Sequence, residues 1–173
     1  MSSGRKKIFF ALSIIVPFLL YCGYYYGMMV KNAPYKFAEF KSIVFEYGNG
    51  DSLVNKYNSA TRNYQFVNSR DSLIKMKLFV SKDELLYLHR KAAELGFWDF
   101  PANQINTPGK IEPNVPHFKI QYNYLRKSKT VIFASNFEGP EPLVDANKRL
   151  IKEIQRILND AEVRSKKEKE VAN

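Results

Sequence analysis

The stretch SKDELLYLHRKAAELGFWDFP, residues 81–101, carries the clearest structural signals in the chain. Ser81 is followed three positions later by Glu84, the spacing of a capping box in which each side chain pairs with a backbone amide of the other residue. Leucine and alanine follow at helical spacing, and Gly96 suits the left-handed backbone that ends many helices. The stretch therefore predicts a helix that ends in a structural turn. The candidate turn residues are Gly96, Asp99 and Pro101.

Alternating apolar and polar residues on both sides of this helix predict β-strands. Three segments before the helix alternate in this way: residues 42–47, 61–67 and 72–80. Residues 117–124 and 130–134 follow it as an expected antiparallel pair, and an amphipathic helix closes the pattern. The order is β-β-β-α-β-β-α, which predicts an α+β domain of two layers, with an antiparallel sheet covered by helices on one face.

This order of segments and the run Leu95-Gly96-Phe97-Trp98-Asp99-Phe100-Pro101 resemble a family of small uncharacterised bacterial domains. Members of that family occur in secreted and lipid-anchored envelope proteins. The resemblance extends over residues 40–159 and implies an α+β fold and an extracytoplasmic location. It implies no catalytic residue. The chain differs from the family pattern in having a long apparent anchor in place of a clear lipoprotein signal.

Residues 8–30, IFFALSIIVPFLLYCGYYYGMMV, contain no charged side chain. A helix of this length measures roughly 34 Å, against about 30 Å for the hydrocarbon core of a bilayer, so the sequence predicts a single transmembrane helix. A basic flank at residues 1–7 favours a cytoplasmic N-terminus and a periplasmic domain. A linker over residues 31–40 leads to the domain at residues 41–163. The basic tail, residues 164–173, is expected to be disordered.

Cys22 leaves three interpretations of the N-terminal segment open. The run Leu19-Leu20-Tyr21-Cys22 partly matches a lipoprotein signal, in which Cys22 would be lipidated, although such signals carry a small residue at the position of Tyr21. A cleaved secretory signal needs small residues before the cut, and the apolar run is not followed by that pattern. In an uncleaved anchor, Cys22 is a small apolar residue of the membrane helix.

Several tyrosines lie near the C-terminal end of the apolar run. On a helix, Tyr21, Tyr24, Tyr25 and Met28 share one face. Tyrosine hydroxyls and the polarizable methionine sulfur favour contact with another membrane helix, so this face is the predicted partner-helix surface. The alternative is an aromatic belt at the level of the lipid headgroups.

Charge and composition exclude several classes of function. The formal net charge is +10, yet the chain has no motif of a nucleic-acid-binding module, so we expect no nucleic-acid partner. A solvated surface or contact with anionic lipid headgroups explains the basic excess. A single cysteine excludes a cysteine-based zinc site, and two histidines are too few to enclose a metal ion, so no metal or cofactor is expected.

The residues with catalytic chemistry do not form a recognisable motif. His89, His117 and Asp99 would serve a tethered envelope hydrolase, but a surface histidine, a strand-edge histidine and a turn-stabilising carboxylate explain them as well. A ligand-binding or envelope-polymer-binding domain would use Tyr122 and Tyr124 on the sheet. We expect no catalytic residue, and the sequence favours a membrane-anchored, non-enzymatic accessory or scaffold protein of the bacterial cell envelope that binds a protein partner.

Overall fold

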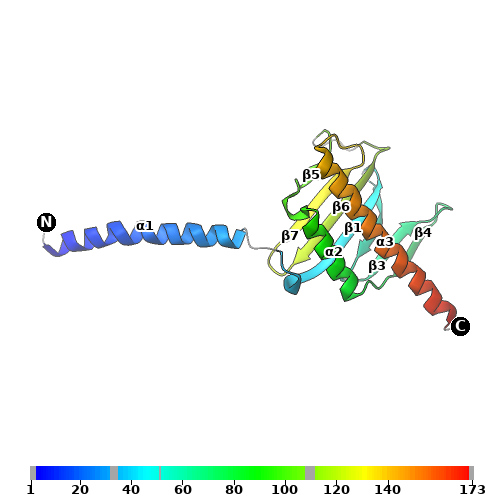
Figure 1. The fold of residues 1–173 in the computed structure, drawn as a ribbon, viewed down its shortest axis with the longest axis horizontal. Helices are drawn as coiled ribbons and strands as arrows, with labels where there is room; N and C mark the ends of the chain where they lie inside the picture. The colour runs from blue at the N-terminus through cyan, green and yellow to red at the C-terminus, as the bar shows by residue number, and fades with distance from the viewer. Residues whose placement is uncertain (1–2, 32–34, 51, 108–111, 172–173) are drawn as a thin grey trace. The chain divides into compact units, whose positions relative to one another are not determined.

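The computed structural model describes residues 3–31, 35–50, 52–107 and 112–171 (Figure 1). The side chains of residues 3, 5–8, 11, 27–31 and 169–171 lie outside this description. The chain forms two compact units, Met1–Tyr35 and Lys36–Asn173.

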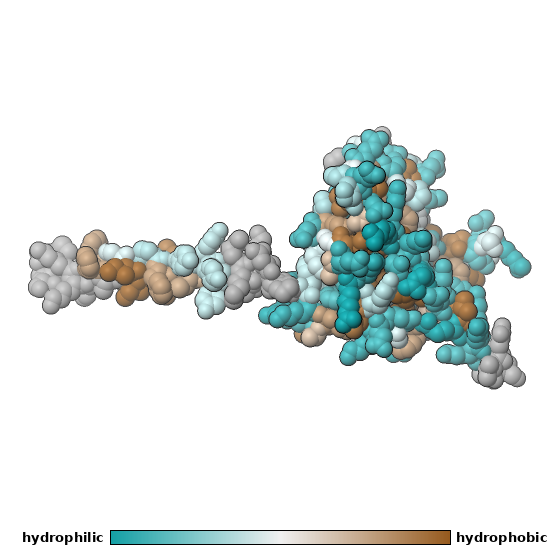
Figure 2. Space-filling view, in the orientation of Figure 1, coloured by the Kyte–Doolittle hydropathy of each residue, from teal (hydrophilic) through white to brown (hydrophobic). Residues whose placement is uncertain are grey.

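The first unit consists of one helix, α1 (Ser3–Lys31), which continues through Pro17. Figure 2 shows hydrophobic residues along its described part, with paler, less hydrophobic residues beside them and toward its C-terminal end. The transmembrane prediction for residues 8–30 is not confirmed, because among the described residues no helix combines the length and the apolar character that a membrane crossing needs. The last side chains that the structure describes in this segment are the tyrosines at positions 24–26. These are less hydrophobic than the aliphatic residues before them.

The second unit is an α+β domain built on a seven-stranded sheet, which confirms the predicted α+β class, whereas the prediction of a fully antiparallel sheet was wrong. The strand order across the sheet is β4-β3-β2-β1-β6-β7-β5. All neighbouring strands are antiparallel except β5 and β7, which are parallel, so the sheet is mixed. The strands are β1 (Phe40–Asn49), β2 (Ser52–Asn58), β3 (Asn63–Val67), β4 (Leu73–Lys77), β5 (Asn103–Gln104), β6 (Pro116–Tyr124) and β7 (Ser128–Ala134).

Two helices, α2 (Lys82–Glu94) and α3 (Glu141–Val171), cover one face of the sheet (Figure 1). The predicted capping box is present at the start of α2, where the Ser81 hydroxyl accepts the Glu84 amide and the Glu84 carboxylate accepts the Ser81 amide. Between the sheet and the helices lies an apolar core, in which Phe45, Tyr122 and Leu150 have no solvent exposure. Two short 3-10 helices, η1 (Phe37–Glu39) and η2 (Phe97–Asp99), complete the described elements.

The predicted order of strands was wrong in two places. The structure has a strand, β2, at Ser52–Asn58, where the sequence predicted none. Asn55 interrupts the apolar alternation of this strand on its core-facing side, and hydrogen bonds to neighbouring strands satisfy its amide. The second missed strand, β5, has only two residues and pairs with β7 through a tertiary contact that leaves no periodic pattern.

The predicted disordered tail is helical as far as Val171, the end of α3. Ion pairs hold this part of the helix. Arg164 contacts Glu84 of the capping box at 2.8 Å, and Lys166 contacts Glu162 one turn earlier at 2.7 Å. A basic composition was therefore a poor indicator of disorder, because Arg164 and Lys166 have acidic partners on α2 and α3.

The uncovered face of the sheet is polar, as the lysines of the predicted strand at residues 72–80 indicated. Lys75 and Lys77 of β4 are exposed on it. In the middle of the same face, Glu46 of β1 lies between Lys56 of β2 and Lys119 of β6, and pairs with Lys119 at 3.1 Å. Charged residues on this face explain why the helices pack on the opposite one.

Candidate functional site

The tyrosine face predicted on α1 is partly visible in the structure. The rings of Tyr21 and Tyr25 stack at 6.3 Å with an interplanar angle of 21°, so these two residues do share a helix face. Both rings and that of Tyr24 are exposed. Cys22 lies inside α1 and is half-buried. The side chain of Met28 lies outside the described residues. Lipidation of Cys22 and the partner-helix role of the tyrosines stay predictions.

The candidate turn after α2 has the predicted backbone. Gly96 has φ of +77°, in the left-handed region that costs glycine least. The turn closes through the backbone, since the Asp99 amide donates to the Gly96 carbonyl at 3.0 Å. The Asp99 side chain is exposed, and so is Pro101. Asp99 is therefore a solvent-exposed residue of the turn.

His89 is a core residue on α2. Its Nδ1 atom lies 2.8 Å from the Tyr124 hydroxyl, and the rings of Phe37 and Trp98 each lie 5.5 Å from the imidazole centroid. Burial lowers the pKa of His89, and the nearby positive charge of Arg90 lowers it further. The histidine is consequently neutral at pH 7 and joins η1, α2, η2 and β6 at one aromatic cluster.

The second histidine lies far from the first. His117 is near the start of β6, whereas Tyr124, the partner of His89, ends that strand. Seven residues of extended chain separate the two ends by roughly 23 Å. His117 is buried and contacts the Val115 carbonyl through Nδ1 at 2.8 Å. The structure therefore places the two histidines apart, so they do not form one site, and a hydrolase that uses Asp99 or a single histidine stays a prediction.

The proposed ligand contact through the strand tyrosines was wrong. Tyr122 and Tyr124 are 0% and 5% exposed, because their side of β6 faces the helices. The Tyr122 hydroxyl donates to the Leu88 carbonyl of α2 at 3.2 Å. An alternating strand does not reveal which of its faces is covered, so sequence alone could not distinguish a ligand surface from a core surface.

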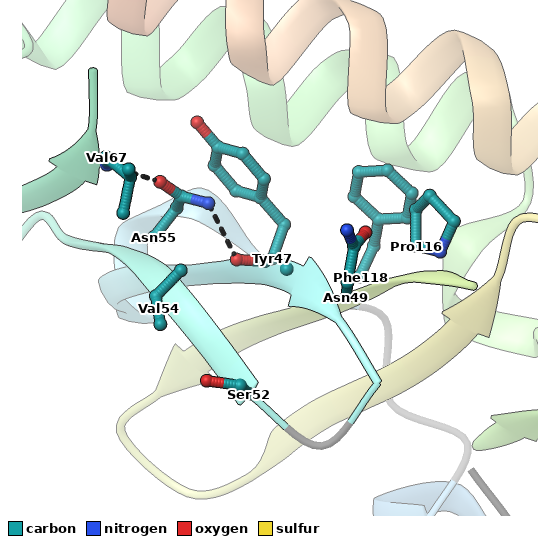
Figure 3. A pocket seen from close by; sticks show the side chains of 9 residues that line it. Tyr47, Asn49, Ser52, Val54, Asn55, Val67, Pro116 and Phe118 are labelled. Carbon is teal, nitrogen blue, oxygen red and sulfur yellow. Dashed lines mark hydrogen bonds between the residues drawn. The ribbon is translucent and has the colours of Figure 1, made fainter. Parts of the chain in front are cut away.

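A groove, which we call the end groove, opens where β1 and β2 meet the start of β6 (Figure 3). It has a volume of about 410 Å³, within the size range of small-molecule pockets. Its wall includes two aromatic rings, since Tyr47 and Phe118 stack at 6.2 Å with an interplanar angle of 17°. The lining includes Tyr47, Asn49, Ser52, Asn55, Val67 and Phe118.

Polar groups hold the shape of the end groove. Asn55 donates from Nδ2 to the Tyr47 carbonyl at 3.1 Å and accepts the Val67 amide at 2.9 Å, which ties three strands together. At Gly48 a Cβ atom would lie 2.1 Å from the Ser52 carbonyl oxygen, so only glycine permits this close approach of β1 and β2.

The Tyr47 side chain extends toward the helices (Figure 3), and its hydroxyl is protonated at neutral pH. Burial raises its pKa, as does the negative charge of Glu162, while a hydrogen bond with Tyr64 opposes this rise. Apolar ring faces beside amide and hydroxyl groups suit non-covalent binding of a hydroxyl-rich ligand. No basic or acidic side chain is among the described residues that line the groove, so its chemistry is recognition without charge.

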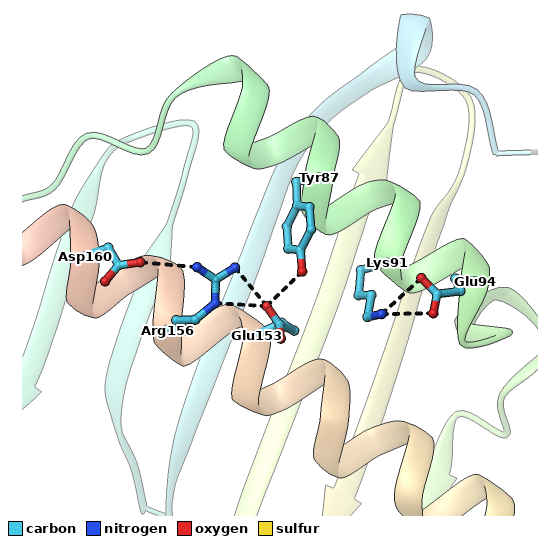
Figure 4. A network of polar contacts seen from close by, with 6 residues as sticks. All are labelled: Tyr87, Lys91, Glu94, Glu153, Arg156 and Asp160. Atoms are coloured by element: carbon cyan, nitrogen blue, oxygen red, sulfur yellow. Dashed lines mark hydrogen bonds and ion pairs between the residues drawn. The ribbon is translucent and has the colours of Figure 1, made fainter.

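A polar network joins the two helices on their outer surface (Figure 4). Glu153 of α3 accepts hydrogen bonds from the Tyr87 hydroxyl at 3.0 Å and from Arg156 at 2.9 Å. Arg156 also contacts Asp160 at 3.3 Å. The Arg156 guanidinium lowers the pKa of Glu153, which keeps the carboxylate ionised. The network fixes how α2 lies against α3, and solvent limits each exposed ion pair to about 0–1 kcal/mol.

Metal binding has no obvious location in the described part of the chain, where no three histidine, cysteine, aspartate or glutamate side chains form a suitable group. Comparisons of the chain with protein-family models, with curated proteins and with solved structures gave no match. The functional conclusion therefore depends on the two features described above, the apolar helix α1 and the surfaces of the α+β domain.

Proposed function

We propose that this protein is a membrane-anchored, non-enzymatic accessory or scaffold protein of the bacterial cell envelope. In this proposal α1 is the anchor, with its N-terminus in the cytoplasm, and the α+β domain binds a protein partner in the periplasm. In this role the anchor holds the folded domain at the membrane, where another protein binds to its surface.

The exposure of apolar side chains on α1 carries this proposal. From Phe9 to Leu20, every described large apolar side chain is at least 47% exposed. Consecutive helical residues are 100° apart, so these side chains cover all sides of the helix rather than one stripe. A helix that is apolar all round is stable only when lipid or another protein covers it. The uncharged sequence of residues 8–30 favours lipid.

The test of the scaffold function is purification of the tagged full chain from bacterial membranes in several mild detergents. A scaffold should bring down the same partner at a constant stoichiometry in each detergent. Recovery of the free monomer alone in all of them would contradict the proposal. The identity of the envelope complex would follow from the partner.

The end groove favours a second function, binding of a hydroxyl-rich envelope polymer or a small ligand. The stacked rings of Tyr47 and Phe118 beside Asn49 are the observation that supports it. A thermal-shift screen of the full chain with envelope polysaccharide fragments should then show stabilisation that Asn49→Ala reduces. Asn63→Ala, an exposed asparagine on β3, is the matched control. If no fragment shifts the melting temperature, or both variants respond alike, the groove is not the ligand site.

A further inference from the structure

A second hollow, which we call the lysine hollow, lies where the α+β domain begins. It measures about 310 Å³ and is lined by Phe37, Ala38, Phe40, Lys41, Lys82 and Leu85. The rings of Phe37 and Phe40 stack at 5.3 Å with an interplanar angle of 16°. Phe37 also packs on His89 of the core, so the apolar floor of the hollow is held in place.

The two lysines give the lysine hollow a positive rim. Lys41 and Lys82 are both exposed, and neither has an ion-pair partner among the described residues. Among the residues that the structure describes, no acidic side chain lines the hollow. The acids nearest in sequence have other contacts, since Glu39 pairs with Arg126 and Glu84 pairs with Arg164. Asp83 follows Lys82 directly and is exposed.

An apolar floor beneath two free ammonium groups matches one kind of molecule, an amphiphile whose anionic head is attached to hydrocarbon. Each lysine near an anionic lipid surface contributes to binding by attraction to the phosphate groups. The stacked rings of Phe37 and Phe40 can cover the glycerol and the first methylene groups of a lipid. A free anion would gain nothing from the rings.

We propose that the lysine hollow binds the headgroup of an anionic phospholipid, with Lys41 and Lys82 on the phosphate and Phe37 and Phe40 against the upper part of the chains. This inference depends on the proposed anchor, because α1 must insert for the domain to work at a lipid surface. The linker favours it, since five peptide steps from Lys31 to Lys36 span at most about 18 Å.

The test is native mass spectrometry of the full chain in uncharged detergent micelles, titrated with phosphatidylglycerol or with phosphatidylcholine. The wild-type chain should retain phosphatidylglycerol in preference to phosphatidylcholine. Lys41→Gln/Lys82→Gln should weaken phosphatidylglycerol binding at least about tenfold, because it removes both charges from the rim. The matched control is Lys56→Gln/Lys75→Gln, which removes two exposed lysines from the uncovered sheet face and should leave the affinity within about twofold.

Three results would overturn the lysine hollow as a lipid site. These are equal binding of the two lipids, equal losses in the two double variants, and displacement of the lipid by glycerophosphoglycerol, which carries the headgroup without chains. The last result would assign the hollow to free phosphodiesters. Because micelles supply lipid whether or not α1 spans a bilayer, the outcome is independent of the anchor. Loss of membrane attachment with intact lipid selectivity would contradict the proposed function and leave the hollow in place.

Discussion

Replacing Gln104 with methionine should destabilise the domain, and adding Asn147→Leu to that variant should restore most of the lost stability. Gln104 of β5 and Asn147 of α3 form a buried amide pair in which neither residue is exposed to solvent. Asn147 Nδ2 donates to Gln104 Oε1 at 2.8 Å and to the Leu143 carbonyl at 2.7 Å. The Asn147 Oδ1 atom is buried and has no hydrogen-bond partner among the described residues.

The expected size of the effect follows from these contacts. Gln104→Met leaves one N–H of Asn147 unpaired, and an unpaired buried polar group costs about 1–3 kcal/mol. Asn147→Leu in the same chain removes that N–H together with the unpaired oxygen and fills the site with a side chain of similar volume. The weaker contact of Gln104 Nε2 with the Pro101 carbonyl, at 3.3 Å, is lost in both variants and cancels in the comparison. The double variant should therefore be more stable than Gln104→Met by about 1–3 kcal/mol.

Urea unfolding of the full chain in detergent micelles measures this, with the fluorescence of Trp98, the single tryptophan of the chain, as the signal. For a slope of about 2 kcal/mol per molar urea, Gln104→Met should lower the midpoint by about 1 M. Gln121→Met is the matched control. Gln121 is half-buried on the uncovered face, and its loss should change stability by less than about 0.5 kcal/mol. A double variant less stable than Gln104→Met would refute the account of the buried pair.

Other predictions concern pH, helix capping and the tyrosine face. Burial lowers the pKa of His89, so as the pH falls the unfolded chain takes up a proton before the folded chain does, and the folded state should lose stability below about pH 6.5. His89→Gln should flatten this part of the plot of urea midpoint against pH. An unchanged plot would contradict the reasoning. Ser81→Ala removes the acceptor that caps α2 and should cost about 1 kcal/mol in the same urea assay, so an unshifted midpoint would argue against the cap. Replacing Tyr21, Tyr24 and Tyr25 with leucine should reduce partner yield from membranes without changing the urea midpoint, whereas wild-type yield would indicate an aromatic belt.

Local signals in the sequence were enough to predict the α+β class and the best-marked elements. The capping box at Ser81 and the left-handed Gly96 are both present, because each depends on hydrogen bonds or backbone freedom within a few residues. The alternating strands β1 and β6 also lie where their pattern placed them. Such features are encoded by neighbouring residues, so they can be read without knowing the rest of the fold.

The features of the fold that depend on tertiary contacts could not be predicted from the sequence. Asn55 occupies a core-facing position of β2 that an alternating pattern reserves for apolar residues, and its partners come from β1 and β3. The helical tail owes its order in part to the pairing of Arg164 with Glu84, eighty positions earlier in the chain. The end groove and the lysine hollow both combine residues from separate elements, and no spacing in the sequence marks them.

The two candidate sites differ in how the sequence relates to them. Lys41 and Phe40 begin β1, whereas Lys82 and Leu85 belong to α2, so only the fold brings these four residues to one hollow. The basic excess did indicate contact with anionic headgroups as an explanation for the charge, without indicating where. For the histidines the opposite holds, because residue type suggested chemistry, whereas the fold places His89 beside Tyr124 at one end of β6 and His117 near the other end.

Alkaline carbonate extraction measures whether the chain is inserted in a membrane through α1. Membranes from bacteria that produce the full chain are washed at high pH, which releases peripheral proteins and leaves inserted ones in the pellet. The wild-type chain should stay in the pellet, and Ile14→Asp/Leu19→Asp, which places two charges in the apolar part of α1, should move the chain to the supernatant. Release of the wild-type chain into the supernatant by the carbonate wash would contradict the proposed anchor.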